Sequence, residues 1–272
     1  MANAPKPTTA KKESSSGSNI FASLSTVVCI LIGFLLWNFV MGDPSNFEGG
    51  DPENGHPLPG NYFGMVYKGG LIVPVLMGLF LMVIVFSFER FFVIGKASGK
   101  GNVDAFVKKI QGLIAAGNVD SAVAECDKQA GSVANVIKSG LKKYKEMEIE
   151  TKMDTEQKCL AIQKDIEEAT ALEMPMLEQN LTVIATLVSI GTLTGLLGTV
   201  TGMIKAFAAL STAGSPDQAA LANGISEALI NTATGIATST VAIIMYNIFT
   251  SKIDKLTYAI DEAGFSIVQT YA

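Results

Sequence analysis

The stretch GISEALINTATGIATSTVAIIMYN, residues 224–247, decides the fold of this chain. The stretch GTLTGLLGTVTGMIK, residues 191–205, lies before it across a short hydrophilic connection. Both stretches are apolar enough to cross a lipid bilayer, where a helical span needs about 20 mainly apolar residues. Together they predict two membrane-spanning helices joined by a hairpin.

The later stretch carries polar residues that lipid would not tolerate. These residues are Glu227, Asn231, Thr234 and Thr238. Their spacing of i, i+4, i+7 and i+11 puts them on one face of a helix. A carboxylate on a spanning helix costs about 2.5–3.5 kcal/mol, so we expect this face to contact protein or water. Two interpretations remain open, namely helix packing by hydroxyls and small residues, or the wall of an ion path.

The depths of the polar residues match across the hairpin. If the segment 211–218 folds at its centre, Thr199 and Thr232 lie level, each about 25 Å from the turn at 1.5 Å per residue. Lys205 and Glu227 also lie level with each other, nearer one face of the membrane. We predict an ion pair between them, because pairing offsets the cost of burying either charge.

Small residues predict where the two helices touch, because glycine lets a neighbouring backbone approach closely in a membrane. The predicted packing positions are Gly191, Gly195, Gly198, Gly202 and Gly235. The hydroxyls of Thr199 and Thr232 can both donate and accept hydrogen bonds. They are therefore suited to orient water or a carboxylate that a partner brings.

The composition excludes several classes of protein. Of the 272 residues, 49% are hydrophobic and 17% are charged, and the mean hydropathy is +0.36, which indicates a membrane protein. The net charge of −5 argues against a nucleic-acid partner, whose binding site would be basic. Cys29, Cys126 and Cys159 lie far apart and His56 is the only histidine, so we expect free thiols and no metal site. The sequence pairs no nucleophile with a base, and we expect neither an enzyme nor a cofactor.

The distribution of lysine predicts the topology, because lysine-rich segments stay in the cytoplasm. We divide the chain into a disordered cytoplasmic tail (1–19), an extra N-terminal transmembrane helix (20–41), an outer loop (42–68), a transmembrane helix (69–92), a cytoplasmic helical domain (93–179), a transmembrane helix (180–210), an outer hairpin (211–218), a transmembrane helix (219–250) and a cytoplasmic C-terminal helix (251–272). A cleaved signal peptide is the alternative for the first span. The run from Met153 predicts a helix continuous with the third span and kinked at Pro175.

GLLGTVTGM, a short hairpin and then GISEALINTATGIATSTVAIIMYN resemble the ExbB/TolQ family, and ExbB most of all. This family is related to the MotA/PomA flagellar stators. The similarity is closest over Leu181–Asp254, weakens toward Glu89 and Arg90, and does not cover Met1–Gly60. It implies an all-α homo-oligomeric channel of the bacterial inner membrane, a pentamer in that family, whose outer loops are periplasmic.

The resemblance also implies a function. The chain would belong to a motor driven by the proton motive force, built around the single spans of an ExbD/TolR-like partner whose aspartate carries the ion. Thr199 and Thr232 match the family's two pathway threonines, and Glu227 matches its glutamate near the start of the last span. In ExbB relatives, a TonB-like transducer then energises transport across the outer membrane.

Three alternatives remain beside this interpretation: a TolQ-like motor for envelope integrity, a flagellar stator, and a passive scaffold whose polar face only packs helices. Two features depart from the family. The segment 20–41 adds a fourth span, as in the stators, and Lys205 is basic where we expect no basic residue. We expect the transported ion to be H⁺, although a path lined by hydroxyls also suits Na⁺.

Overall fold

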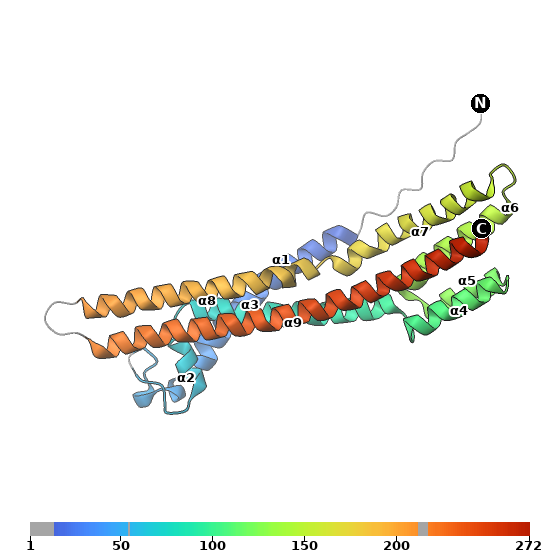
Figure 1. Cartoon of the computed structure of the whole chain (residues 1–272). Coiled ribbons are helices and arrows are strands. Elements are labelled where there is room, and N and C mark those ends of the chain that lie inside the picture. The colour runs from blue at the N-terminus through green and yellow to red at the C-terminus, as the bar shows by residue number, and fades with distance from the viewer. Residues whose placement is uncertain (1–13, 54, 212–216) are drawn as a thin grey trace. The chain divides into compact units, whose positions relative to one another are not determined.

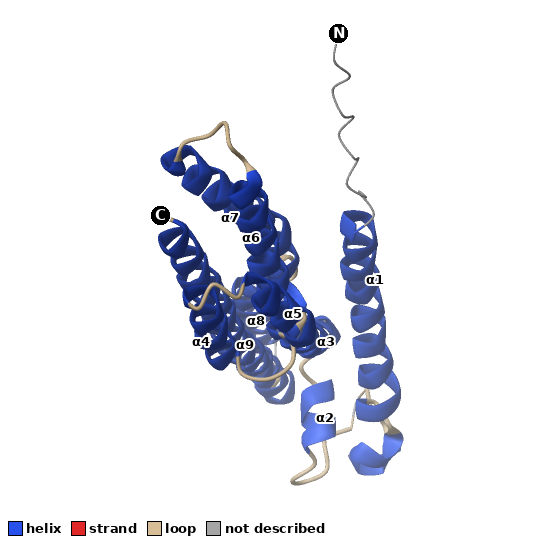
Figure 2. Cartoon of the chain, turned by 90° about the vertical axis from the view of Figure 1, so that its right-hand side faces the viewer, coloured by secondary structure: helices blue, strands red, loops and turns tan. Residues whose placement is uncertain are grey.

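The computed structural model of the chain describes residues 14–53, 55–211 and 217–272. These residues form helices joined by loops, and their only β-type pairing is an isolated bridge between Phe47 and Pro57 (Figure 2). A π-helix at Leu36–Met41 continues α1, and two short 3-10 helices follow it. The predicted all-α class is confirmed. The helices are α1 (Ser14–Leu35), α2 (Tyr62–Tyr67), α3 (Ile72–Ser98), α4 (Val103–Ala115), α5 (Val119–Gln129), α6 (Gly131–Ile149), α7 (Thr155–Glu178), α8 (Leu181–Leu210) and α9 (Gln218–Tyr271), as labelled in Figure 1.

Four stretches of helix among the described residues are long and apolar enough to cross a membrane. Each of the four predicted spans overlaps one of these stretches. Helix α9 is unbroken over 54 residues, so the predicted span 219–250 and the predicted C-terminal helix 251–272 form one helix. The four stretches are Ala22–Met41, Ile72–Ala115, Thr155–Leu210 and Gln218–Tyr271.

Two predictions about the N-terminal part need correction. Of the predicted disordered tail, residues 1–13 lie outside the described residues, but residues 14–19 belong to α1. A helix nucleated by the apolar run adds residues at little cost, so it extends into the serine-rich sequence. The predicted irregular loop 42–68 contains α2 and both 3-10 helices. Asn61 caps α2, since its side chain accepts from the Gly64 N–H at 3.1 Å.

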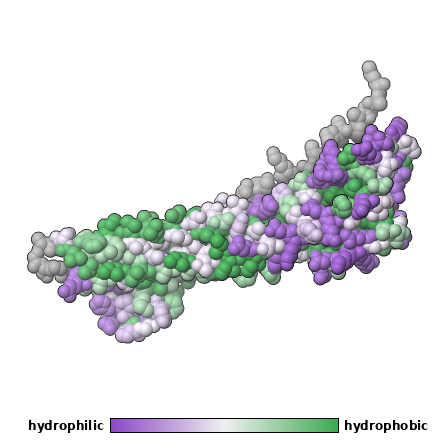
Figure 3. Space-filling view, in the orientation of Figure 1, coloured by the Kyte–Doolittle hydropathy of each residue, from purple (hydrophilic) through white to green (hydrophobic). Residues whose placement is uncertain are grey.

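The chain divides into two compact units, which are described separately. The first comprises residues 1–85 and 187–240, and the second comprises residues 86–186 and 241–272. In Figure 3, hydrophobic residues cover most of the visible surface of α8 and α9 in the first unit. An apolar exterior of this kind suits lipid or a neighbouring protein helix. Exposed apolar side chains of this unit include Leu193, Leu197, Val200, Ile204 and Phe207.

In the first unit, α8 and α9 lie antiparallel with their backbones in contact (Figure 1). A Cβ atom added to Gly195 would lie 3.0 Å from the Cα of Gly235, and one added to Gly202 would lie 2.7 Å from the backbone N of Ala228. No side chain fits in either gap, so these positions need glycine. The centre of the predicted hairpin, residues 212–216, lies outside the described residues.

Helix α1 packs against α3 through two further glycines of the first unit. A Cβ atom on Gly33 would lie 2.4 Å from the carbonyl oxygen of Pro74, and one on Gly78 would lie 2.8 Å from the Cα of Ile30. Cys29 is buried beside this contact, with 4% of its surface exposed. The N-terminal span thus contacts α3 closely within the first unit, and its retention in the mature protein stays a prediction.

In the second unit, α4, α6 and α7 contact the C-terminal part of α9, and α5 packs against α4 and α6. Hydrophilic residues dominate its visible surface over α4 to α7 (Figure 3). Burial raises the pKa of the Cys126 thiol on α5 to about 12, so the thiol stays protonated at neutral pH. All three cysteines are free, as predicted. The buried apolar core of this unit includes Ile110, Ile114, Ile137, Leu141, Ile162, Ile260 and Ile267.

The junction of α7 and α8 differs from the sequence prediction. Helix α7 ends at Glu178 and α8 begins at Leu181, so the prediction of one continuous helix is wrong. Helix α7 runs through Pro175, the interruption follows at residues 179–180, and the kink at Pro175 stays a prediction. The interruption leaves the last carbonyl groups of α7 without their helical partners.

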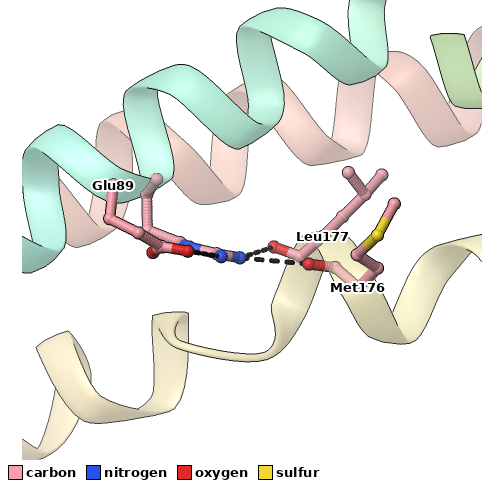
Figure 4. A network of polar contacts seen from close by, with 4 residues as sticks. Glu89, Met176 and Leu177 are labelled. Carbon is pink, nitrogen blue, oxygen red and sulfur yellow. Dashed lines mark hydrogen bonds and ion pairs between the residues drawn. The ribbon is translucent and has the colours of Figure 1, made fainter. Parts of the chain in front are cut away.

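Arg90, the only arginine of the chain, supplies the missing partners. Its Nη1 donates to the carbonyl oxygens of Met176 and Leu177 at 3.1 and 3.0 Å (Figure 4). Its Nε donates to the carboxylate of Glu89 at 2.5 Å. In a continuous helix, those carbonyls would accept from backbone N–H groups four residues further on. Arg90 therefore caps α7 and places a positive charge at the negative end of its dipole.

Gly33→Ala should lower the free energy of unfolding by about 1–3 kcal/mol, because the added methyl group presses on the backbone of α3. Gly95→Ala is the matched control, since Gly95 is also helical and no atom lies within 4 Å of a Cβ added there. The control should be neutral or stabilising by up to about 1 kcal/mol, because alanine is the better helix former. Thermal unfolding in detergent micelles measures both, and equal effects would contradict the proposed packing.

Arg90→Met should lower the free energy of unfolding by about 1–3 kcal/mol, because buried carbonyl groups of α7 lose their donor. Amide hydrogen exchange should become faster at residues 179–184. Lys164→Met is the control: its ion pair with Glu168 is exposed, and its effect should stay within about 0.5 kcal/mol. Unchanged exchange at the junction in Arg90→Met would show that another group caps α7.

Candidate functional site

An ion pair lies where α8 approaches its end and α9 begins. The Nζ of Lys205 donates to Oε1 of Glu227 at 2.6 Å, so the structure brings together the two residues predicted to pair. The glutamate side chain is 11% exposed, whereas the lysine side chain is 61% exposed. The cost of desolvation therefore falls mainly on Glu227, and its contact with the ammonium group offsets part of that cost.

Further along the helix pair, the hydroxyl groups of Thr199 and Thr232 hydrogen-bond to each other. Each hydroxyl also lies within reach of a carbonyl on its own helix, Gly195 O at 3.3 Å from Thr199 and Ala228 O at 3.0 Å from Thr232. A hydroxyl has one proton, so one threonine donates to the other while the second donates to its carbonyl. The pair has two such arrangements. It can accept a hydrogen bond from a third group through a hydroxyl lone pair, and it can donate one to that group when a hydroxyl stops donating to the carbonyl of its own helix.

The same helix register forms a second hydroxyl pair. The hydroxyl of Thr192 donates to that of Ser239 at 2.8 Å. Thr192 lies seven residues before Thr199, and Ser239 lies seven residues after Thr232, so both pairs face the same side of each helix. Thr192 was not among the predicted site residues, although this matched i, i+7 spacing on two antiparallel helices is a signal that identifies it.

The other two predicted threonines of α9 hydrogen-bond to carbonyl groups of their own helix. Thr234 donates to the carbonyl of Ile230 at 2.8 Å, and Thr238 donates to the carbonyl of Thr234 at 2.9 Å. Thr238 and Asn231 are completely buried. Within the single chain, the two threonines behave as packing residues, and their role in an ion path stays a prediction.

Two residues in the turn before α3 belong to the site and were not predicted as part of it. The side chain of Asn231 donates through Nδ2 to the carbonyl oxygen of Gly69 at 2.8 Å. Gly70 has a φ of +77°, and a Cβ atom there would lie 2.5 Å from Oε1 of Glu227. The Gly-Gly pair was the available signal, because adjacent glycines often mark a turn that needs positive φ or a close backbone approach.

The deep part of the site carries no formal charge. Residues 181–204 and 228–250 contain no Asp, Glu, Lys, Arg or His. In the part of the chain that the structure describes, no three side chains from His, Cys, Asp and Glu are grouped to hold a metal ion. The site can therefore offer hydroxyl groups, but it holds no acid of its own at the level of the threonine pairs.

Comparison with known proteins finds that the region containing this site is similar to a known family of channels. Residues 129–262 match the MotA/TolQ/ExbB proton channel family. The chain is 27% identical over 195 residues to the Tol-Pal system protein TolQ of Pseudomonas aeruginosa, which covers 71% of this chain and 84% of that protein. It is 26% identical over 198 residues to a putative biopolymer transport protein ExbB homolog of Methanothermobacter thermautotrophicus, covering 71% of this chain and 66% of that protein.

A third relative is the biopolymer transport protein ExbB of Salmonella typhimurium, 31% identical over 85 residues. That match covers 31% of this chain and 35% of the relative. The chain thus spans less than two thirds of the length of both ExbB-named relatives. Both threonine pairs and the ion pair lie inside the matched family region, whereas α1, α2 and α3 lie outside it.

A double-mutant cycle tests the ion pair. Lys205→Met and Glu227→Gln should show a coupling free energy of about 0.5–1 kcal/mol, a modest value because the lysine is largely exposed. Thermal unfolding in detergent micelles at low ionic strength measures the coupling. Lys252→Met paired with Glu227→Gln is the control, since those residues belong to different units and should be additive. Additive effects of the Lys205 and Glu227 variants would show that the two side chains do not interact, and the ion pair would then not be part of the site.

Proposed function

Since residues 129–262 match the MotA/TolQ/ExbB proton channel family, we propose that the chain is the ion-channel subunit of a motor driven by the proton motive force. The observation that carries the proposal is the hydrogen-bonded pair Thr199–Thr232 on two apolar helices. A hydroxyl pair with two proton arrangements can donate to an ionised carboxylate and accept from a protonated one. It therefore suits a group that binds and releases an ion within the membrane.

The ion-carrying acid comes from a partner protein. The spans of this chain lack a carboxylate at the depth of the threonine pairs, and Glu227 lies near the start of α9 rather than in mid-membrane. We propose that copies of this chain form a ring, a pentamer by the family resemblance, around single-span ExbD/TolR-like helices. An aspartate of that partner would then meet Thr199 and Thr232, and H⁺ would be the transported ion, with Na⁺ as the alternative.

We propose that the chain lies in the bacterial inner membrane with both termini in the cytoplasm. The lysine-rich segment 93–179 supports this orientation, because positively charged segments are retained on the cytoplasmic side. In this orientation the Lys205–Glu227 pair lies toward the periplasm, and the threonine pairs lie deeper. The proposed role needs no cofactor and no covalent chemistry, since the chain guides an ion rather than transforming a substrate.

For the output, we propose a TonB-like transducer that energises transport across the outer membrane, as the resemblance to ExbB implies. A TolQ-like role in envelope integrity is the second candidate. It is favoured by coverage, since the match spans 84% of the TolQ relative but 66% and 35% of the ExbB-named relatives. Purification of the native complex, followed by identification of its small single-span partner and its transducer, separates the two candidates.

Replacing Thr199 and Thr232 together by valine should reduce ion flux at least about tenfold, because a lost hydrogen bond to a charged group costs roughly 1.5–3 kcal/mol. Valine keeps the branched shape, so the oligomer should still assemble. The matched control is Thr240→Val, which removes an exposed hydroxyl bonded to its own helix at Ile236. Flux is measured with the partner present in liposomes that carry a pH-sensitive dye. Full flux in the double variant would support the passive scaffold instead.

A further inference from the structure

Gly69 and Gly70 bring a backbone turn directly onto the buried side of the ion pair. The carboxylate of Glu227 lies where a side chain at Gly70 would be, since a Cβ atom there would be 2.5 Å from Oε1 and 3.0 Å from Cδ. The same Oε1 atom accepts from Lys205 at 2.6 Å. The bare Cα of Gly70 thus limits the positions that the carboxylate can take and leaves it facing the lysine.

Asn231 holds this turn from the next turn of α9. Its Nδ2 donates to the carbonyl of Gly69 at 2.8 Å, and the side chain is completely buried. Helix α8 leaves room for it at Gly198, where a Cβ atom would lie 2.3 Å from the Cβ of Asn231. The carbonyl of Gly69 precedes α3, so it has no partner within that helix, and a buried carbonyl left unbonded would be costly.

The other end of the turn is attached to α1 and its continuation. The carbonyl oxygen of Tyr67 accepts from the Gly70 N–H at 3.2 Å and from Nε1 of Trp37 at 3.3 Å. The rings of Trp37 and Tyr67 are stacked, with centroids 4.6 Å apart. One carbonyl group therefore joins the end of the N-terminal span to the turn that touches Glu227.

We propose that the π-helix Leu36–Met41, which continues α1, and the turn at Gly69–Gly70 form a clamp, made of Trp37, Tyr67, Gly69, Gly70 and Asn231, that positions Glu227 toward Lys205. The clamp gives a function to the part of the chain that lies outside the matched family region. If the proposed function holds, the clamp sets the geometry of the outer mouth of the ion path. Its residues are positioning residues, because they act on the path through Glu227.

The clamp acts on one partner of the pair and leaves the other free. The side chain of Glu227 is enclosed by the turn and by α9, whereas that of Lys205 is 61% exposed and can move away. A fixed acceptor beside a mobile donor keeps the two in contact without holding both in one geometry, which limits the loss of side-chain entropy. Displacing the acceptor should therefore weaken the pair even when both charges remain.

The test measures the coupling between Lys205→Met and Glu227→Gln in four backgrounds of the full-length chain in detergent micelles. In the unchanged background and in Gly60→Ala, the coupling should be the same. In Gly70→Ala and in Trp37→Ala, it should fall by more than half. Gly60→Ala is a matched control, because Gly60 also has positive φ, +81°, and no atom lies within 4 Å of an added Cβ.

This readout separates positioning from general stability. If Gly70 and Trp37 only stabilise the fold, their variants will lower the melting temperature of every member of the cycle equally and leave the coupling unchanged, and the proposal fails. Should Trp37→Ala not fold, Trp37→Phe keeps an aromatic ring but removes the Nε1 donor, and it should reduce the coupling in the same direction. A coupling that falls equally in Gly60→Ala would likewise overturn the proposal.

The clamp and the proposed function can each be rejected while the other is retained. The coupling is measured on the chain alone, whereas the ion path is tested by flux through the assembled complex in the Thr199 and Thr232 variants. Reduced coupling in Gly70→Ala with unaffected flux in the threonine variants would retain the clamp and reject the channel. Unchanged coupling with lost flux would retain the channel and reject the clamp.

Discussion

The contact of bare backbone between α8 and α9 at Gly195 and Gly235 sets the register on which the polar site depends. A side chain at either position would push the helices apart, because backbone atoms occupy the space that its Cβ atom needs. The close approach brings hydroxyl groups within hydrogen-bond distance twice, once at Thr199 and Thr232 and once at Thr192 and Ser239. The glycines thus determine which polar residues meet.

The cost of polar groups in an apolar surrounding explains how the site is arranged. Within α8 and residues 218–250 of α9, the one carboxylate is that of Glu227, which lies near the start of α9, where an exposed lysine can reach it. Deeper in the pair, the polar groups are the amide of Asn231 and a set of hydroxyls, and the hydroxyls can bond to carbonyls of their own helices and are therefore inexpensive to bury. Such an arrangement is stable without a charged group among the hydroxyls.

In both units, a side chain from another helix donates a hydrogen bond to a carbonyl group where regular helix stops. In the first unit, the amide of Asn231 donates to the carbonyl of Gly69, ahead of α3. In the second unit, the guanidinium of Arg90 donates to two carbonyls at the end of α7. A buried carbonyl outside the helical pattern needs a donor, and a side chain from another helix provides it. The position of each irregular segment is thereby tied to one residue on a different helix.

The sequence by itself determined the helical spans, because these follow from local apolar runs. It also determined that Thr199 lies level with Thr232 and Lys205 with Glu227, because these matched depths follow from counting residues along two helices. Only the tertiary structure decided where α7 stops and which turn covers Glu227. Those features depend on donors far away in the chain, since Arg90 and Leu177 are 87 residues apart, and Asn231 and Gly69 are 162 residues apart. No local pattern records such a pairing, because it exists only once the helices have packed.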